Sequence, residues 1–465
     1  MYKKDIIKKF MRNILIESLG FIEMYKDSFP PDYDDYIDIK VDHKNKKWST
    51  YARKVVNLRK WQKKNEMLSI PSVKDLVDYL STAEGEDNQY YRDDIEPFFQ
   101  SAVEEKLGKI PIYKILPIAN AYINKFGTSF KESSFDYIFD AWYESFERPN
   151  SYRRIFVLRN LVLDGLDFID LLGYRIRPLK NYEIKFLIAF GSYNQNATHY
   201  NFLNIPVSLT GDLNPEYCVE VPSQVFGETD ERKSSEYIKN RLLGLLLTFK
   251  LKTVTMETEL NYDIMSEFSI DYPGSLLTNY LEPHHYFSTP YVLILSDYDK
   301  LSKYERLYAN IKLDDDKALN LAIRRFLMPI WRFEAEDIIL DYMIALEALL
   351  SDSEQDIQYR ISIRSAYLIS ESPGERPRIS EIMRGFYNLR SHIVHGNAKD
   401  LSKAKRKLEK LLLSKPGNGF IAVDTLREYV RLTIQGYVIF SSNIKCGNCK
   451  KNFLQNLDEK ILGIK

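Results

Sequence analysis

The segment FEAEDIILDYMIALEALLSD, residues 333–352, predicts one long amphipathic helix. Its apolar residues recur at spacings of three and four, which places them on one face of an α-helix. A helix with so wide an apolar face needs other helices to cover it. The predicted core stripe comprises Ile338, Ile339, Tyr342, Met343, Ala345, Leu346, Leu349 and Leu350.

The sequence on both sides of this segment also has helical periodicity. Apolar residues at helical spacing occupy 318–328 and stop at Pro329, which cannot continue a helix. Gly396 is a predicted helix C-cap, because it directly follows an apolar-periodic segment. Short connections between consecutive helices favour antiparallel neighbours, so we expect an up-and-down helical bundle over residues 301–445. Its later helices are predicted at 355–370, 378–395, 401–414 and 422–442.

The middle of the chain, residues 151–300, has a different pattern. Segments rich in Val, Ile, Leu and Tyr alternate partly with polar residues there, which predicts strands. They lie at 153–163, 171–179, 216–222 and 289–297, while 234–251 has helical spacing. We therefore expect an α+β region with a possible sensor or regulatory role. It contains no Gly-rich phosphate loop, no GxSxG elbow and no HExxH motif.

The N-terminal residues are predicted to be mainly helical. Within them, the basic stretch 44–64 carries Trp48, Tyr51 and Trp61 between its charges. Such a stretch can form a nucleic-acid surface, or a solvated helix whose aromatic side chains face the core, and we favour the helix. The predicted fold is thus mainly α with an α+β middle region. Its predicted parts are 1–150, 151–300, 301–445 and a C-terminal tail at 446–465.

The composition excludes several classes of protein. The 465-residue chain has 65 Lys or Arg and 65 Asp or Glu, so it has no bulk positive charge for coating nucleic acid. Three cysteines are too few for a disulfide scaffold. The longest apolar run, 242–249, is far shorter than the ~20 residues of a membrane-crossing helix. The first residues do not resemble a signal peptide, so we expect a cytoplasmic protein with no membrane partner.

The segment FYNLRSHIVHGN, residues 386–397, carries the most chemistry. It holds Arg390, Ser391, His392 and His395, and the two histidines are a third of the six in the chain. Arginine offers a planar cation that matches phosphate oxygens, and histidine can transfer a proton near neutral pH. Together they could bind and cleave a phosphodiester without a metal. The alternative is a structural arginine beside a histidine at an interface.

Helix geometry limits how these side chains can cooperate. Arg390 and His395 are five residues apart, so they point about 140° away from each other at ~100° per residue. They could flank a groove, or a second subunit could complete the site. Ser391 and His392 each share a face with His395 and could orient a phosphate.

The charge around this segment is locally positive. Residues 357–415 contain thirteen Lys or Arg and five Asp or Glu, a balance of +8 in a chain that is neutral overall. A phosphate backbone would be attracted to such a region. The alternative interpretation is a solvated face of basic helices.

Glu347 lies within the apolar segment IALEALL, so we expect its carboxylate to be partly buried. A buried charge needs a partner, and the candidates are Arg364 and Arg390. The pair could lock the helices together, which we consider the simpler interpretation, or it could position Arg390.

Cys446 and Cys449 form a CxxC motif near the C-terminus. The motif supplies two zinc ligands, whereas a structural zinc site needs four. Cys218 is remote, so a zinc site would need ligands from distant residues or from a second chain. Two reduced thiols are the simpler interpretation, and we predict no cofactor.

Three segments, 333–350, 359–369 and 386–397, resemble the ApeA-like branch of the HEPN superfamily, in order and at similar spacing. The resemblance covers residues 305–443 and implies a dimerising bundle of four or more helices. It further implies an Arg-x(4–6)-His motif, which falls here on Arg390 and His395. Ser391 stands where the family more often has Asn, Asp or His. Glu347 and Arg364 match polar positions of this branch.

The resemblance implies a metal-independent endoribonuclease that cleaves RNA through attack by the neighbouring 2′-hydroxyl. It further implies a homodimer that acts as a toxin or abortive-infection effector in antiviral defence. The N-terminal region would hold it inactive until a phage-derived trigger arrives. The alternative is a non-catalytic HEPN module for dimerisation or for binding nucleotide or RNA. A third possibility is a zinc-dependent interaction protein that uses Cys446 and Cys449.

Overall fold

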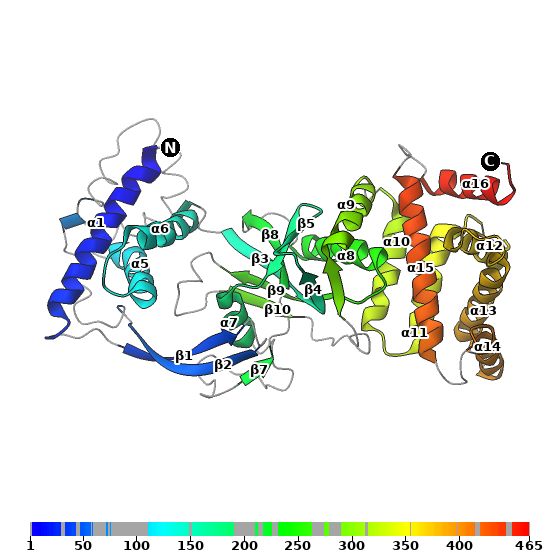
Figure 1. Cartoon of the computed structure of the whole chain (residues 1–465), viewed down its shortest axis with the longest axis horizontal. Helices are drawn as coiled ribbons and strands as arrows, with labels where there is room; N and C mark the ends of the chain where they lie inside the picture. Colours follow the sequence, from blue (N-terminus) through cyan, green and yellow to red (C-terminus); the bar gives the residue numbers. More distant parts are fainter. Residues whose placement is uncertain are drawn as a thin grey trace.

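The structure is a computed structural model of an elongated molecule with helices at both ends and a sheet between them (Figure 1). N-terminal helices lie at one end, and the C-terminal helices lie at the other. The structure describes residues 2–28, 33–42, 47–56, 58, 71–72, 75, 110–147, 151–189, 210–212, 217–225, 231–262, 274–278, 290–311, 315–353, 355–396, 398–413, 419–442 and 449–464.

At the N-terminal end, the described residues include three helices that share a core of their own. They are α1 (Tyr2–Tyr25), α5 (Ile110–Phe126) and α6 (Glu132–Glu147). Each is amphipathic, and α1 buries Met11, Ile14 and Leu15 completely. This part of the chain is mainly helical, as its periodicity predicts.

A β-hairpin is the exception in this part. Strand β1 (Tyr33–Asp42) pairs antiparallel with β2 (Lys47–Val56), and β2 also pairs with β7 (Thr210–Asp212). The predicted helix in the basic stretch is therefore wrong over β2. Its Trp, Thr, Tyr and Val residues suit a strand, and pairing with β1 satisfies the backbone. Asn124 of α5 then holds the end of β2, because its side chain bonds both the N–H and the C=O of Val56.

A six-stranded antiparallel sheet occupies the middle of the molecule, in the order β10-β9-β3-β8-β6-β5. Two further strands, β4 and β11, pair in parallel beside it. The predicted α+β character of this region is confirmed. The strands are β3 (Ser151–Arg159), β4 (Leu161–Asp164), β5 (Ile169–Leu171), β6 (Tyr174–Pro178), β8 (Tyr217–Val225), β9 (Thr255–Tyr262), β10 (Gly274–Thr278) and β11 (Tyr291–Ile294).

Two helices accompany this sheet, α7 (Asn181–Ala189) and α8 (Glu231–Phe249). Alternate residues of β3 point to opposite faces, and Phe156 and Leu158 belong to the same core cluster as Leu242 and Leu246 of α8. Helix α8 therefore covers one face of the sheet.

The chain from residue 295 onward is helical in the residues that the structure describes. The elements are α9 (Leu295–Ala309), α10 (Lys317–Leu327), the 3₁₀ helix η3 (Met328–Trp331), α11 (Ala335–Leu350), α12 (Ile357–Ile369), α13 (Arg376–His395), α14 (Ala398–Leu411), α15 (Gly419–Ser441) and α16 (Cys449–Ile461). The whole predicted core stripe of α11 is buried, and each of its residues is at most 4% exposed.

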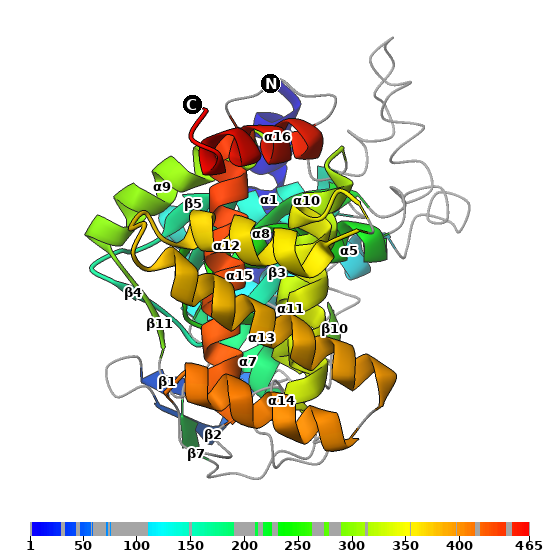
Figure 2. The same ribbon diagram turned by 90° about the vertical axis from the view of Figure 1, so that its right-hand side faces the viewer.

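The C-terminal helices form two crossed layers. Helices α12, α13 and α14 lie side by side, with α13 in the middle, and they cross the direction of α15 (Figure 2). Helix α11 packs against both α13 and α15 and so joins the layers. The expected antiparallel neighbours are present from α12 to α14. The crossing of α15 departs from a simple up-and-down arrangement, because α15 must also cover α8 and α10.

One hydrophobic core joins the sheet to these helices. A single cluster of buried side chains runs from Phe156 in β3 to Leu457 in α16. At its centre, Gly244 of α8 allows a close approach. A Cβ atom there would lie 2.6 Å from the hydroxyl of Tyr308 and 2.8 Å from Cγ2 of Ile323.

Helix α15 also binds α8 through polar contacts. Arg431 donates to the carbonyl oxygens of Thr248 and Phe249, at 3.0 and 3.1 Å. These carbonyls lie at the end of α8, where helical partners run out. The arginine therefore completes the C-terminal end of α8.

Candidate functional site

Helix α13 carries the predicted catalytic residues, Arg390 and His395, on its last two turns. It ends at His395, and Gly396 adopts the left-handed conformation with φ of 66°. The N–H of Gly396 bonds the carbonyl of Ile393 at 3.2 Å. The predicted C-cap is therefore confirmed, and it leaves the final side chains of α13 at the edge of the helical region.

Arg390 lies beside Glu347 of α11. Its Nη2 donates to Oε2 of Glu347 at 3.4 Å, and its Nε lies 3.4 Å from Oε1. The second pair is not oriented for a hydrogen bond, so both of its atoms lack a hydrogen bond within the described residues. By contrast, Asp341 on the same helix holds Arg325 at 2.7 Å. The contact of Arg390 with Glu347 is thus loose.

The surroundings of Glu347 disfavour its charged form. Burial raises the pKa of the Glu347 carboxyl, and the positive charge of Arg390 opposes that rise without cancelling it. The two side chains are 22% and 28% exposed, so solvent reaches the pair. The Arg390 guanidinium also lies 5.9 Å from the ring centroid of Tyr387. A loosely held and partly exposed arginine retains donors for an external anion.

His395 faces away from this ion pair. It is exposed, whereas Ser391 and His392 are half-buried. Arg390 points toward α11, and the helical rotation between Arg390 and His395 is about 140°. No contact joins the guanidinium to the imidazole among the residues described for a single chain. The structure therefore brings Glu347 and Arg390 together and leaves His395 on a different face of α13.

Arg364 does not contact Glu347. It is 3% exposed and donates to the carbonyl of Leu350 at 2.6 Å. Its Nε and Nη2 bond the two carboxylate oxygens of Asp458 at 2.8 and 2.6 Å, and it also contacts Asp352. Of the two candidate partners for Glu347, only Arg390 takes that position. Arg364 instead ties α12 to α16 and to the end of α11.

Helix α16 lies within the predicted C-terminal tail. It packs Phe453, Leu454 and Leu457 into the main core, and the Phe453 ring contacts the rings of Tyr437 and Phe440. Cys446 lies outside the described residues. The side chain of Cys449, at the start of α16, lies outside them as well. The zinc hypothesis for this CxxC motif therefore stays a prediction.

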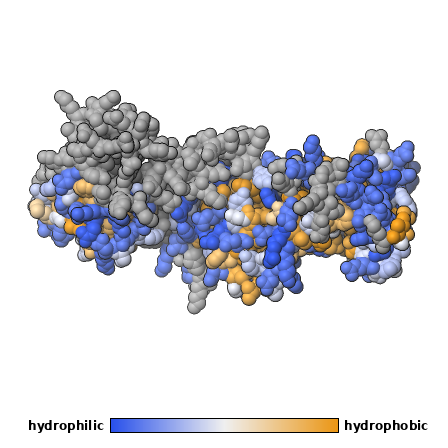
Figure 3. Space-filling view, turned by 90° about the horizontal axis from the view of Figure 1, so that it is seen from above, coloured by the Kyte–Doolittle hydropathy of each residue, from blue (hydrophilic) through white to orange (hydrophobic). Residues whose placement is uncertain are grey.

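The described residues lack two other kinds of site. No group of three or more His, Cys, Asp or Glu side chains in them could hold a metal ion. Within the same residues, none of the helices has both the length and the apolar character to cross a membrane. The face in Figure 3 shows apolar patches interleaved with hydrophilic side chains.

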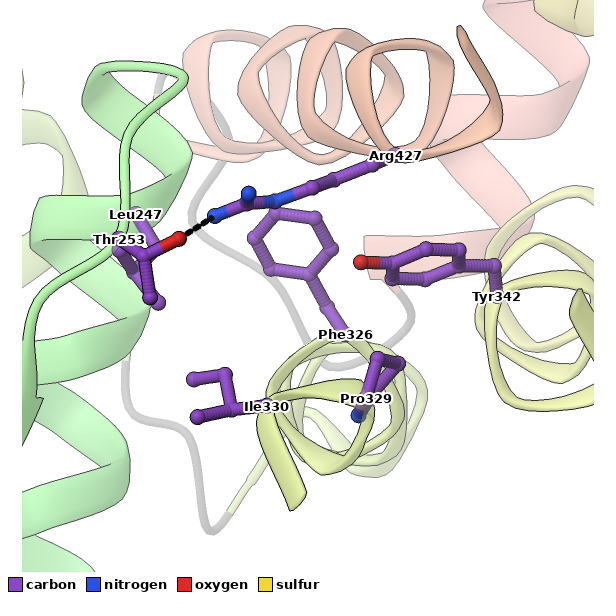
Figure 4. A pocket seen from close by; sticks show the side chains of 7 residues that line it. All are labelled: Leu247, Thr253, Phe326, Pro329, Ile330, Tyr342 and Arg427. Carbon is purple, nitrogen blue, oxygen red and sulfur yellow. Dashed lines mark hydrogen bonds between the residues drawn. The ribbon is translucent and has the colours of Figure 1, made fainter. Parts of the chain in front are cut away.

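A small pocket lies between the end of α8 and the C-terminal helices (Figure 4). Arg427 of α15 extends past the ring of Phe326 and donates to the hydroxyl of Thr253 at 3.1 Å. The pocket takes residues from α8, α10, η3, α11 and α15 and none from α13. It is therefore part of the junction between the two regions and separate from the residues around Arg390. The full lining is Leu247, Thr253, Phe326, Pro329, Ile330, Tyr342 and Arg427.

Three polar residues near the site were not singled out by the sequence. Gln358 at the start of α12 bonds the side chain of Asn388 at 2.8 Å and the carbonyl of Arg384 at 3.3 Å. Arg384 and Asn388 are exposed on α13. Arg384 and Asn388 precede His395 by eleven and seven residues, and both spacings place residues on one face of a helix. The sequence could therefore have shown that they share a face with His395. The contact with α12 could not be inferred from spacing.

Comparisons with known proteins found no matching family model, no matching curated protein and no matching solved structure.

Proposed function

We propose that this protein is a metal-independent endoribonuclease of the HEPN type. The observation that carries the proposal is the partly exposed, loosely paired Arg390, next to Ser391 and five residues before the exposed His395. These residues lie within a region of charge +8. The resemblance of residues 305–443 to the ApeA-like branch adds to it.

In this proposal, Arg390 binds the scissile phosphate and stabilises the charge that develops on its oxygens. The 2′-oxygen of the ribose attacks phosphorus, and the bond from phosphorus to the 5′-oxygen breaks. His395 assists by transferring a proton, taken from the 2′-hydroxyl or given to the leaving 5′-oxygen. The products are a 2′,3′-cyclic phosphate and a free 5′-hydroxyl. Ser391 and His392 orient the phosphate.

The divergence of Arg390 and His395 fits a site completed by a second copy. In a homodimer through the helical region, as the resemblance implies, the last turns of two α13 helices would face each other. Arg390 of one chain could then act near His395 of the other. The N-terminal 300 residues would restrain this activity until a phage-derived trigger binds, because a free ribonuclease in the cytoplasm harms its own cell.

A second candidate is a non-catalytic HEPN module that dimerises or binds nucleotide or RNA. The observation that favours it is the contact between Glu347 and Arg390, since a neutralised arginine has less affinity for phosphate. In that case His395 and Arg390 would support an interface only.

The test is cleavage of total cellular RNA by the purified chain, with EDTA present throughout. Wild type is compared with Arg390→Ala, His395→Ala and the control Arg306→Ala, which changes an exposed arginine on α9. The proposal expects discrete products with cyclic phosphate ends from wild type and from the control only. Equal cleavage by all four proteins would reject the assigned residues. RNA binding without cleavage, unchanged in His395→Ala, would favour the non-catalytic module.

A further inference from the structure

One face of α13 carries a continuous polar stripe. Arg384, Asn388, Ser391 and His395 follow one another at steps of four, three and four residues, so their side chains fall within about 60° of each other. All four are exposed or half-buried. The eleven steps from Arg384 to His395 span about 16 Å along the helix axis. The stripe therefore extends from the last turn of α13 back to the middle of the helix.

An exposed tyrosine stands at the far end of this stripe. Tyr359, near the start of α12, is 59% exposed. The guanidinium carbon of Arg384 lies 5.9 Å from the centroid of its ring. The preceding residue, Gln358, bonds both the side chain of Asn388 and the carbonyl of Arg384. Those bonds fix the start of α12 against the stripe, so the ring has a defined place beside it.

The charge of Arg384 is available to a ligand. No ion pair neutralises it among the residues that the structure describes, although ion pairs hold Arg390 and Arg364. A cation and an aromatic ring side by side are suited to a nucleobase, which can stack on the ring or on the guanidinium plane. The surrounding +8 balance favours a ligand with a phosphate backbone.

We propose that Tyr359 and Arg384 form a stacking subsite for a base of single-stranded RNA, whose backbone follows the α13 stripe toward His395. This inference rests on the proposed function and names its substrate class. A base in a duplex is stacked on its neighbours, so only an unpaired base offers a free face to Tyr359. The distance of about 16 Å separates this base from the scissile phosphate by a few nucleotides.

The test measures binding of a fluorescent single-stranded oligonucleotide whose 2′-hydroxyls are methylated, so that cleavage by the 2′-oxygen is impossible. Fluorescence anisotropy compares wild type with Tyr359→Leu and Tyr359→Trp. A stacked base is worth enough that Tyr359→Leu should weaken binding about tenfold. Tyr359→Trp should bind as tightly as wild type or more tightly, because it keeps an aromatic face.

The chain supplies a matched control. Tyr367, farther along α12, also lies against an arginine, with the guanidinium carbon of Arg376 4.1 Å from its ring centroid. That pair lies at the other end of α12 and α13, away from His395. Tyr367→Leu should leave the affinity unchanged. An oligonucleotide of the same length without bases should bind wild type and Tyr359→Leu equally.

Several results would overturn the subsite. They are no binding by wild type, equal binding by wild type and Tyr359→Leu, or an equal loss in Tyr367→Leu. A shift of Tyr359→Leu from dimer to monomer in sedimentation equilibrium would also overturn it, because Tyr359 would then belong to an interface between copies. The proposed function fails separately. If wild type binds the methylated strand but cleaves no RNA, the subsite stands and the nuclease proposal fails. If wild type cleaves RNA but Tyr359→Leu binds the methylated strand equally well, the nuclease proposal stands and the subsite fails.

Discussion

The carboxylate of Glu347 and the guanidinium of Arg390 approach each other to 3.4 Å, which is too far for a strong charge-assisted hydrogen bond. The helices α11 and α13 thus hold two opposite charges close together without locking them. Such a pair neutralises part of the charge of Arg390 and leaves its remaining donors open to another anion. Glu347 therefore lies in surroundings that disfavour its charged form.

The first prediction concerns Glu347→Gln and pH. Burial raises the pKa of Glu347 above its ordinary value of 4.5, so the folded state favours the protonated form more than the unfolded state does. Wild type therefore loses stability as pH rises through and above that value. The glutamine variant lacks this loss. Its free energy of unfolding relative to wild type should increase between pH 4 and pH 7 in urea titrations.

The same substitution at Glu336 serves as the control for Glu347→Gln. Glu336 also lies on α11, is 41% exposed in its side chain and pairs with Lys405 at 2.6 Å. A pH-independent difference between Glu347→Gln and wild type would contradict the raised pKa.

The second prediction concerns Arg364. Replacing it with Met leaves the carbonyl of Leu350 and the carboxylate of Asp458 without their partner. We expect a loss of about 2–3 kcal/mol in the free energy of unfolding, since part of the unpaired charge stays solvated. Urea titration measures it. Arg360→Met is the matched control, because Arg360 also contacts Asp352 but is far more exposed, and it should cost less than about 1 kcal/mol.

The third prediction concerns Gly244→Ala. The added methyl group would overlap the hydroxyl of Tyr308 and the side chain of Ile323, so we expect a loss of about 1–3 kcal/mol. Adding Tyr308→Phe should restore part of that loss, because it removes one of the two close atoms. In α1, by contrast, a Cβ at Gly20 meets nothing within 4 Å, and Gly20→Ala should stabilise by up to about 1 kcal/mol. Thermal denaturation distinguishes these results, and equal effects at Gly244 and Gly20 would refute the close approach.

The fourth prediction concerns Arg431→Met. The variant leaves the carbonyl of Thr248 without its side-chain donor, and that of Phe249 keeps only the longer bond from Gln435, at 3.4 Å. We expect a loss of about 1–3 kcal/mol and faster hydrogen exchange in the last turn of α8, since orphan carbonyls weaken a helix end. Unchanged exchange in α8 would show that α15 does not stabilise it.

The helices could be predicted from the sequence because their apolar spacing is a local property. The divergence of Arg390 from His395 also followed from the helical period alone. The partner of Glu347 did not, because both Arg364 and Arg390 were suitable in charge, and only the packing of α11 against α13 selects one. Strand β2 was missed for a similar reason. Its strand conformation depends on pairing with β1, which lies outside the basic stretch.

Contacts that join distant segments were the least predictable. Asp458 lies 94 residues after Arg364, and no pattern in either segment indicates that they meet. The pairing of Tyr359 with Arg384 depends on how α12 lies against α13. Arg390 and His395 could therefore be found from the sequence, while the contact of Tyr359 with Arg384 could be found only from the fold.

The core that runs through residue 300 has a consequence for dividing this chain into fragments. Helix α8 covers side chains of α10 and α15, so a fragment beginning at residue 301 would present that apolar surface to water and would tend to aggregate. A fragment beginning at residue 151 would retain the covering helix. The sheet and the C-terminal helices should therefore melt in one cooperative transition, because packed helices connect α8 to α13 through α15 and α11.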